Sequence, residues 1–266
     1  MTQDNTVKKR IFSFDLDMTL LDHETWRIPD SAMEALEHLR RDSVIVIASG
    51  RNMDHEMSVM YRDIIQPDAV IHMNGTRVVA EGHVLYEHLM DKERLRSLLS
   101  YADERGLSIG VSHEGYDYYI HPEGVVRMDK ERWGSSERQF RDGWQLMELP
   151  VRTLAYIGGP EQAREMEEHF PDFKLPMFAG KTGADVVERE ASKAKGLVRI
   201  CQYYGIGMED TVAFGDSMND YEIVQEAGVG IAMGNSIEEL KQVADYVTDD
   251  IDRDGIWKAC RHFNWI

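Results

Sequence analysis

The first quarter of the chain alternates short apolar runs with an amphipathic helical pattern. Short, mainly apolar runs occupy residues 11–14, 44–48 and 69–73. The run at 44–48 has no polar alternation, which is typical of a strand covered on both faces of a parallel sheet. Between the first two runs, apolar residues recur at three-residue steps, and Ser31 with Glu34 has the form of a capping box. We therefore expect a helix over residues 30–40, and a strand–helix–strand unit.

The last third of the chain repeats this alternation. We expect strands at residues 212–214, 229–233 and 246–248. A helical pattern reaches Tyr204 and is followed by Gly205, which is typical of a helix C-terminus. Further helices are predicted over residues 218–227 and from Ser236, with Glu239 completing its capping box. The two ends of the chain therefore belong to one sheet.

The middle of the chain has a different pattern. Predicted strands follow one another at residues 107–111 and 116–120, then at 153–157 and 184–187, with helices at 92–105 and 161–169. Strands that follow strands indicate an antiparallel α+β insertion. We predict a core built from residues 1–83 and 188–266 and an inserted domain over residues 84–187, with hinges near Gly82 and Gly183.

Composition narrows the class of protein. The 266 residues include 30 Lys and Arg against 48 Asp and Glu, so the formal net charge is −18. Such a chain repels the phosphate backbone of nucleic acid, and no apolar run approaches the roughly 20 residues that span a membrane. The two cysteines and the lack of an export signal favour a cytoplasmic protein. We expect neither nucleic acid nor a membrane as a partner.

A pair of carboxylates follows the first apolar run. Asp15 and Asp17 leave a buried strand together, and two such groups repel one another unless a cation neutralises them. A hard divalent metal is the simplest remedy. Asp-x-Asp also arises by chance in a chain this rich in Asp, as at residues 250–252 and 252–254, so solvated carboxylates on a turn remain the alternative.

Three further clusters fall at the expected ends of strands or starts of helices, where open α/β sheets bind their ligands. They are Ser49-Gly50-Arg51, Ser192-Lys193 and Gly215-Asp216-Ser217-Met218-Asn219-Asp220. A hydroxyl, a glycine and a cation suit phosphate oxygens, and a lysine in the first turn of a helix is favourable only beside an anion. Each cluster alone is also compatible with an ordinary turn, a solvated lysine or a helix cap.

In order and spacing, these clusters resemble the four motifs of the haloacid dehalogenase (HAD) superfamily. The segments His72-Met-Asn74-Gly75-Thr76 and Val229 to Ser236, with the long insertion, are similar to the Cof-type, class IIB sugar phosphatases. The resemblance implies an α/β fold with a Rossmann-like parallel-sheet core and an inserted α+β cap domain. It also implies a Mg²⁺-dependent phosphomonoesterase that hydrolyses small phosphorylated metabolites such as sugar phosphates.

The resemblance also implies roles for individual residues. Asp15 is expected to be the nucleophile that forms an aspartyl-phosphate, and Asp17 the acid and base, with a raised pKa. Mg²⁺ is expected on the Asp15 side chain, the Asp17 backbone carbonyl and Asp216, with Asp220 in the outer shell. The residues expected to bind substrate phosphate are Thr19, Ser49, Gly50, Arg51, Lys193 and Asn219.

One position departs from the family pattern. Met18 stands where the family commonly has glycine, so we expect a negative φ there. All motif carboxylates are retained, which argues against a non-catalytic copy.

The inserted domain is expected to contact the leaving group and so to set specificity. Its polar and aromatic candidates, each of which could equally serve packing, are Tyr116, Tyr118, Tyr119, His121, Lys181 and Asp185. The alternatives to a phosphatase are a phosphomutase and a non-catalytic phosphate sensor on the same scaffold. The pattern leaves open whether the protein is a monomer or a weak dimer.

Overall fold

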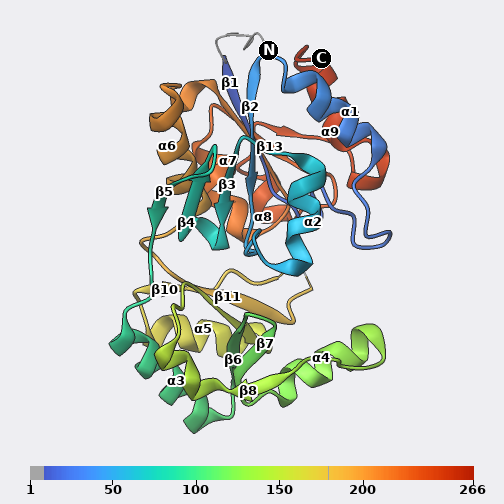
Figure 1. Ribbon diagram of the computed structural model, residues 1–266. Coiled ribbons are helices and arrows are strands. Elements are labelled where there is room, and N and C mark those ends of the chain that lie inside the picture. Colours follow the sequence, from blue (N-terminus) through green and yellow to red (C-terminus); the bar gives the residue numbers. More distant parts are fainter. Residues whose placement is uncertain (1–8, 179) are drawn as a thin grey trace. The chain divides into compact units, whose positions relative to one another are not determined.

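The computed structural model describes residues 9–178 and 180–266 (Figure 1). The chain divides into two compact units. The first contains the described residues up to Glu87 together with Ala191–Ile266, and the second is His88–Glu190. In the described residues, no helix is both long and apolar enough to cross a membrane.

The first unit is built on an eight-stranded sheet. In spatial order its strands are β14 (Tyr246–Val247), β13 (Val229–Ala232), β12 (Thr211–Gly215), β1 (Arg10–Phe14), β2 (Ser43–Ala48), β3 (Ala69–His72), β4 (Arg77–Ala80) and β5 (His83–Glu87). Neighbours from β14 to β3 pair in parallel, whereas β4 and β5 add an antiparallel hairpin at one edge. Every residue of β2 is buried, as the unbroken apolar run predicts.

Helices cover both faces of this sheet, with α6 on one side and α1 and α9 on the other in Figure 1. One apolar cluster joins the sheet to α1 (Asp30–Leu39), α2 (Glu56–Ile65) and α9 (Gly255–His262). A second cluster joins the opposite face to α6 (Lys193–Tyr204), α7 (Tyr221–Glu226) and α8 (Glu238–Lys241). The unit is therefore an α/β/α sandwich in which both ends of the chain share one sheet.

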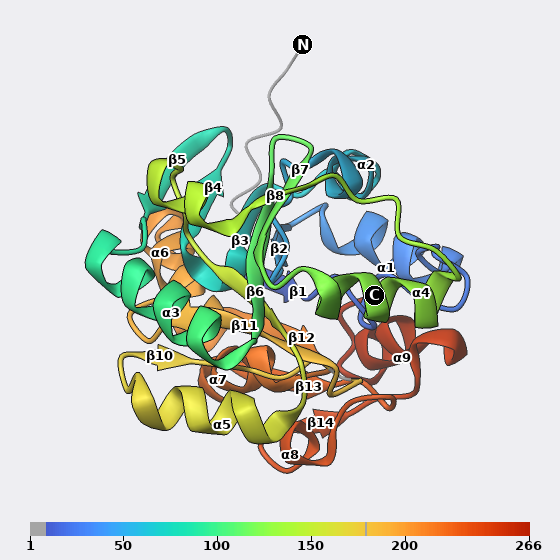
Figure 2. The same ribbon diagram turned by 90° about the horizontal axis from the view of Figure 1, so that it is seen from below.

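The second unit is an α+β domain with its own core. In spatial order its strands are β10 (Phe173–Lys174), β11 (Gly183–Glu188), β9 (Leu154–Ile157), β6 (Ser108–His113), β7 (Tyr116–Ile120) and β8 (Phe140–Asp142). The pairs are antiparallel except for β7 with β8. Helices α3 (Lys92–Arg105) and α5 (Pro160–His169), seen from below in Figure 2, pack their apolar residues against this sheet.

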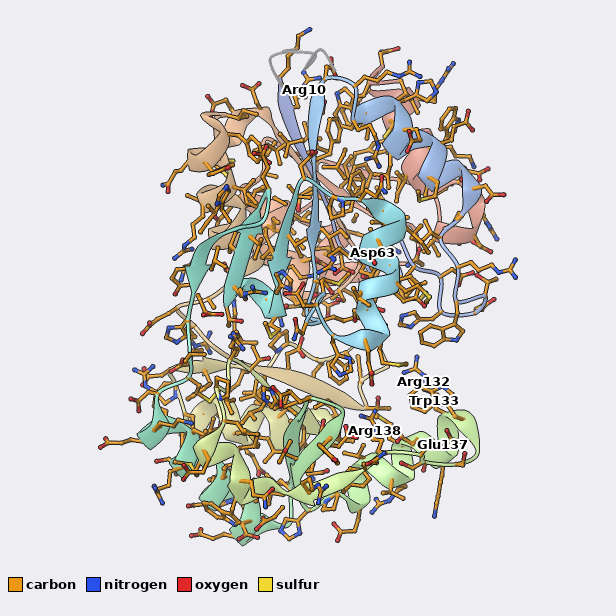
Figure 3. The ribbon with its side chains drawn as sticks, viewed as in Figure 1. Arg10, Asp63, Arg132, Trp133, Glu137 and Arg138 are labelled. Atoms are coloured by element: carbon orange, nitrogen blue, oxygen red, sulfur yellow. The ribbon has the colours of Figure 1, made fainter. Side chains whose placement is uncertain are left out.

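A third helix of this unit, α4 (Glu123–Trp133), has no counterpart among the predicted elements. Figure 3 labels Arg132, Trp133 and Arg138 at and beyond its end. Arg138 donates to the carboxylates of Asp129 on α4 and Asp117 on β7, at 2.8 and 2.9 Å. This pairing fastens the segment that leads from α4 to β8.

The boundary between the units differs from the predicted one. The second unit begins at His88 rather than at residue 84, because β5 pairs with β4 and so stays in the first sheet. Gly82, expected at a hinge, instead forms the turn of that hairpin with a φ of 78°. The second unit ends at Glu190, just after β11, rather than at residue 187.

Two predicted helix caps are wrong. Helix α1 begins at Asp30 after Pro29, so Ser31 lies inside its first turn, and no side chain caps it. Helix α8 begins at Glu238 after Ile237, and the Ser236 hydroxyl has no hydrogen-bond partner among the described residues. In contrast, Ser192 does cap α6 by accepting from the Lys195 backbone N–H, and Gly205 ends that helix with a φ of 66°.

Candidate active site

The polar clusters follow strands β1, β2 and β12, which are neighbours in the sheet. Asp15 and Asp17 follow β1, Ser49 follows β2, and Asp216 follows β12. The Asp15 backbone N–H donates to the Phe214 carbonyl at 3.0 Å, so the ends of β1 and β12 are in register. Parallel strands thus bring these residues to one edge of the sheet.

Lys193 joins two of the acidic clusters. It is the first residue of α6 and its side chain is fully buried. Its Nζ donates to Asp15 Oδ1 and to Asp220 Oδ1, each at 2.6 Å. Burial alone would lower the pKa of Lys193, but the two carboxylates raise it, so the ammonium is retained. The anion expected beside this lysine is therefore present.

Carboxylate oxygens of Asp15, Asp216 and Asp220 lie within 4.8 Å of one another. Burial and the neighbouring carboxylates raise the pKa of Asp15 and of Asp216. Asp220 has both oxygens engaged: Oδ1 accepts from Lys193, and Oδ2 accepts from the backbone N–H groups of Asp216 and Ser217. Its side chain is a fixed support for the cluster.

The donor set fits a hard divalent cation. Three buried carboxylates face one ammonium, which leaves an excess of negative charge. Among the described residues, none donates a hydrogen bond to the carboxylate of Asp216, although that residue is only 4% exposed. Oxygen ligands of this kind are what Mg²⁺ prefers.

Asp17 lies beside this cluster with different partners. Arg51 Nε donates to Asp17 Oδ2 at 2.8 Å, and Arg51 Nη2 and His23 Nε2 both contact Asp17 Oδ1, the latter at 2.6 Å. Burial would raise the pKa of Asp17, but hydrogen bonds and charge from His23 and Arg51 outweigh it and lower the pKa to about 2. The expected raised pKa is therefore wrong for this arrangement.

The φ expected for Met18 is also wrong. Met18 adopts a φ of 59°, in the left-handed region. Its backbone N–H donates to the Leu21 carbonyl at 2.8 Å, and its own carbonyl accepts from Asn235 Nδ2 at 2.9 Å. Both backbone groups are thus tied in a conformation that glycine would adopt at less cost.

The remaining predicted phosphate ligands lie around the same edge of the sheet. Ser49 Oγ accepts from the Arg51 backbone N–H at 3.0 Å, across Gly50, and keeps its own hydrogen for another acceptor. Asn219 accepts from Ser217 Oγ and donates to Asn74 Oδ1. Thr19 is different, because its hydroxyl is fully buried and without a hydrogen-bond partner among the described residues.

The sequence argument did not assign three polar residues that the structure brings to this edge. They are His23, Asn74 and Asn235. Asn74 carried a signal, since Asn-Gly follows an apolar run and tolerates the left-handed φ of 55° found there. Asn235 also carried a signal, since it lies in the segment Val229 to Ser236 that resembles the family. His23 carried none, because its contact with Asp17 is set by folding.

The candidate specificity residues are held in various ways within the second unit. Tyr118 packs against the apolar cluster of this unit, and Tyr119 is buried with its ring against that of Phe140. His121 Nε2 lies 3.1 Å from the Asp103 carbonyl. The Tyr116 ring lies under the Arg141 guanidinium, Lys181 is exposed, and Asp185 is half-buried. Their predicted roles in specificity stay predictions.

Comparison with known proteins places this site in a family. The pattern of haloacid dehalogenase-like hydrolases matches residues 12–260. The protein YkrA of Bacillus subtilis (strain 168) is 30% identical over 262 residues, covering 95% of this chain and 96% of YkrA. Phosphatase YwpJ of the same organism is 26% identical, covering 95% of this chain and 99% of YwpJ.

A solved structure agrees with these relatives. The HAD subclass IIB sugar phosphatase BT4131 has a TM-score of 0.87 and 29% sequence identity, covering 97% of this chain and 100% of that one. The fold, the site and the relatives all assign the chain to the same family. The chain belongs to the haloacid dehalogenase-like hydrolases, in which it is a phosphatase with the subclass IIB fold.

Proposed function

We propose that this phosphatase is a Mg²⁺-dependent phosphomonoesterase that acts on small phosphorylated metabolites, sugar phosphates foremost, through an aspartyl-phosphate. The observation that carries the proposal is the buried group Asp15, Asp216, Asp220 and Lys193, with Asp17 beside it. This group combines a nucleophile, a cation site and a second carboxyl group for proton transfer at one edge of the sheet.

In the first step, Asp15 attacks the phosphorus of the substrate and a new P–O bond forms to its carboxylate. The bond from phosphorus to the leaving oxygen breaks, and Asp17 transfers a proton to that oxygen. Asp17 is ionised in the substrate-free arrangement, since its pKa is about 2. The negative charge of the phosphate entering beside it raises this pKa and allows Asp17 to carry the proton.

In the second step, water attacks the phosphorus of the aspartyl-phosphate. Asp17, now a carboxylate, accepts a proton from that water, and the P–O bond to Asp15 breaks. Inorganic phosphate leaves and Asp15 is restored. Asp17 thus regains a proton from water in place of the one that it gave to the leaving group.

The remaining residues hold the phosphoryl group and its charge. Lys193 neutralises Asp15 and the transferring group, and Ser49 and Asn219 supply hydrogen-bond donors. Arg51, whose guanidinium lies on Asp17, orients that carboxyl group in addition to its expected contact with phosphate. Bound to Asp15 and Asp216, with Asp220 behind them, Mg²⁺ would act as a Lewis acid on the phosphoryl oxygens.

Substrate choice is assigned to the second unit. The first unit supplies the same phosphoryl chemistry for any monoester, so it offers little basis for discrimination. The second unit has its own apolar core and carries aromatic and charged residues on its strands and turns, among them Tyr116, Lys181 and Asp185. These residues are the candidates that contact the leaving group.

The test is phosphate release from a panel of sugar phosphates, nucleotides, pyridoxal phosphate and flavin mononucleotide, each with Mg²⁺ and with a chelator. We expect release from sugar phosphates that needs Mg²⁺. Isomerised product without phosphate would identify a phosphomutase instead. Binding without any turnover would identify a phosphate sensor.

The matched variant is Asp15→Asn, which keeps the shape of the side chain and removes the nucleophile. We expect turnover to fall by at least about a thousandfold while the protein stays folded. Substantial activity in this variant would show that Asp15 is not the nucleophile.

A further inference from the structure

We infer that His23, presented by a turn built around Asp22 and stacked on Trp26, is a positioning residue that orients the carboxyl group of Asp17 for proton transfer to the leaving group. The inference rests on the proposed function. It assigns a role to a residue that belongs to none of the four motifs. In the sequence, His23-Glu24 is notable only because it does not extend to a His-Glu-x-x-His zinc motif.

The first observation is the convergence of two residues on one carboxylate. His23 reaches Asp17 Oδ1 from the turn after β1, at 2.6 Å, and Arg51 reaches both oxygens from the turn after β2. A carboxylate only accepts hydrogen bonds, so Nε2 of His23 is the donor. Because the donors come from different segments, together they fix both the position and the plane of the carboxyl group.

The second observation is how the turn that carries His23 is built. The buried carboxylate of Asp22 accepts from the Glu24 backbone N–H and from Thr25 Oγ1, each at 2.8 Å. The Asp22 carbonyl accepts from the Trp26 N–H at 2.8 Å, and the Asp22 N–H donates to the Arg27 carbonyl at 3.0 Å. Asp22 therefore determines the path of the whole turn from inside it.

The third observation concerns Trp26, which is 41% exposed and has a φ of 54°. A large side chain is sterically disfavoured in the left-handed region. Its ring stacks on the His23 imidazole, with centroids 4.8 Å apart and planes 16° apart. The stack restricts rotation of the imidazole and so holds Nε2 toward Asp17.

These contacts select one oxygen of Asp17. A carboxylate has about four lone-pair sites. Oδ1 accepts from both His23 and Arg51 Nη2, whereas Arg51 Nε is the one donor to Oδ2 among the described residues. Oδ2 therefore keeps the free lone pair and is the atom that carries the proton to the leaving oxygen. Without His23, Oδ1 would also keep a free lone pair, and either oxygen of the carboxyl group could carry the proton to the leaving group.

The experiment compares two variants on two substrates. His23→Phe keeps a flat ring on Trp26 and removes the donor, while His23→Gln keeps an N–H near the position of Nε2. The substrates are the best sugar phosphate of the panel, whose leaving alkoxide needs a proton, and p-nitrophenyl phosphate, whose leaving group does not. The quantity measured is kcat/KM, which reports the steps up to leaving-group departure.

We expect His23→Phe to lower kcat/KM for the sugar phosphate about tenfold or more and for p-nitrophenyl phosphate by less than about threefold. His23→Gln should stay within about threefold of the wild type on both. The matched control is His38→Phe, which alters another histidine in ring contact with a tryptophan, Trp257, remote from the site. It should leave both values unchanged.

If His23→Phe lowers kcat/KM equally on both substrates, or on neither, the inference is overturned and the proposed function still stands. If His23→Phe does not fold, His23→Leu against His23→Gln gives the same contrast. A wild-type protein that releases phosphate from neither substrate overturns the proposed function itself, and the inference with it.

Discussion

Lys193 is a cation in the first turn of a helix, where the helix dipole disfavours positive charge. Asp15 and Asp220 offset that cost through hydrogen bonds of 2.6 Å each. Asp216 is the opposite case, a buried carboxylate to which none of the described residues donates. At the scale of single residues, the site therefore holds more acidic than basic groups, and this excess is the basis for the proposed cation.

The first prediction concerns Asp216→Asn. Burial and the carboxylates of Asp15 and Asp220 raise the pKa of Asp216, so its charged form is disfavoured in the folded protein. The neutral isostere should raise the melting temperature of the metal-free protein, by about 2–4 °C for each kcal/mol relieved. It should also remove the stabilisation that Mg²⁺ gives.

Thermal unfolding with a chelator and with Mg²⁺ measures both effects. The control is Asp210→Asn, which neutralises an exposed carboxylate just before β12 and should change neither value. A lower melting temperature for metal-free Asp216→Asn would contradict the charge argument.

The second prediction is a pH dependence of the metal effect. The pKa values of Asp15 and Asp216 are raised above the ordinary value of 3.8, so the unfolded chain releases these protons at lower pH than the folded protein. Metal-free stability from this site is therefore retained at low pH and falls as pH rises from about 4 toward the raised values.

Mg²⁺ must compete with those protons, so the shift in melting temperature that it produces should be larger at pH 8 than at pH 5.5. Calorimetric scans at both pH values, with and without Mg²⁺, measure the difference. A shift independent of pH would show that the ion does not bind these carboxylates.

At the scale of elements, the junctions between strands and helices place the site. Ser192 caps α6 directly before Lys193, and the loop after β3 packs against it. Gly75 in that loop has a φ of 91°, and a Cβ built there would lie 2.1 Å from the Ser192 carbonyl oxygen. The close approach of this loop thus fixes the start of α6, and with it the position of Lys193.

The third prediction is that Gly75→Ala lowers both stability and activity. The unfavourable φ and the clash with Ser192 together cost about 2–4 kcal/mol. Because the start of α6 must shift, kcat should fall as well. The matched control is Gly205→Ala at the other end of α6, where φ is 66° and no atom lies within 4 Å.

Gly205→Ala should cost about 1–2 kcal/mol with no change in kcat. Chemical denaturation gives the free energies of unfolding, and steady-state kinetics gives kcat. Equal kcat values for the two variants would mean that the loop after β3 does not position Lys193.

At the scale of the whole molecule, the net charge of the protein has the same sign as that of a phosphorylated substrate. The formal net charge is −18, yet Lys193 and Arg51 place positive charge at the site. The net charge describes the solvated exterior, whereas we expect the cations at the site, together with the proposed metal, to govern affinity for the substrate. The long-range field slows the approach of the substrate, while the short-range field holds it.

The fourth prediction follows from this opposition. The Debye length falls from about 30 Å at 0.01 M to about 8 Å at 0.15 M ionic strength, so added salt screens the exterior more than the buried site. We expect kcat/KM for a sugar phosphate to rise about two- to threefold over this range at constant free Mg²⁺. A fall with salt would mean that the field at the site entrance attracts anions.

Much of the fold could be predicted because burial leaves a local signature. The apolar run at 44–48 became the fully buried β2, and the predicted helix at 92–105 has the bounds of α3, Lys92–Arg105. The β4–β5 hairpin and α4 were missed. β5 is largely exposed, and few residues of α4 are buried. Neither element therefore shows a clear periodic pattern of apolar residues.

The sequence by itself determined which chemical groups stand at the ends of β1, β2 and β12. The positions of the strands along the chain and of the motifs that follow them can be read from the local sequence. Only the tertiary structure decided their partners. It placed Arg51 and His23 on Asp17, set its pKa low, and held Met18 at a positive φ through Leu21 and Asn235. Some of these contacts join residues far apart in sequence, such as Arg51 with Asp17 and Asn235 with Met18. The energies of all these contacts depend on distance and burial, which no local pattern encodes.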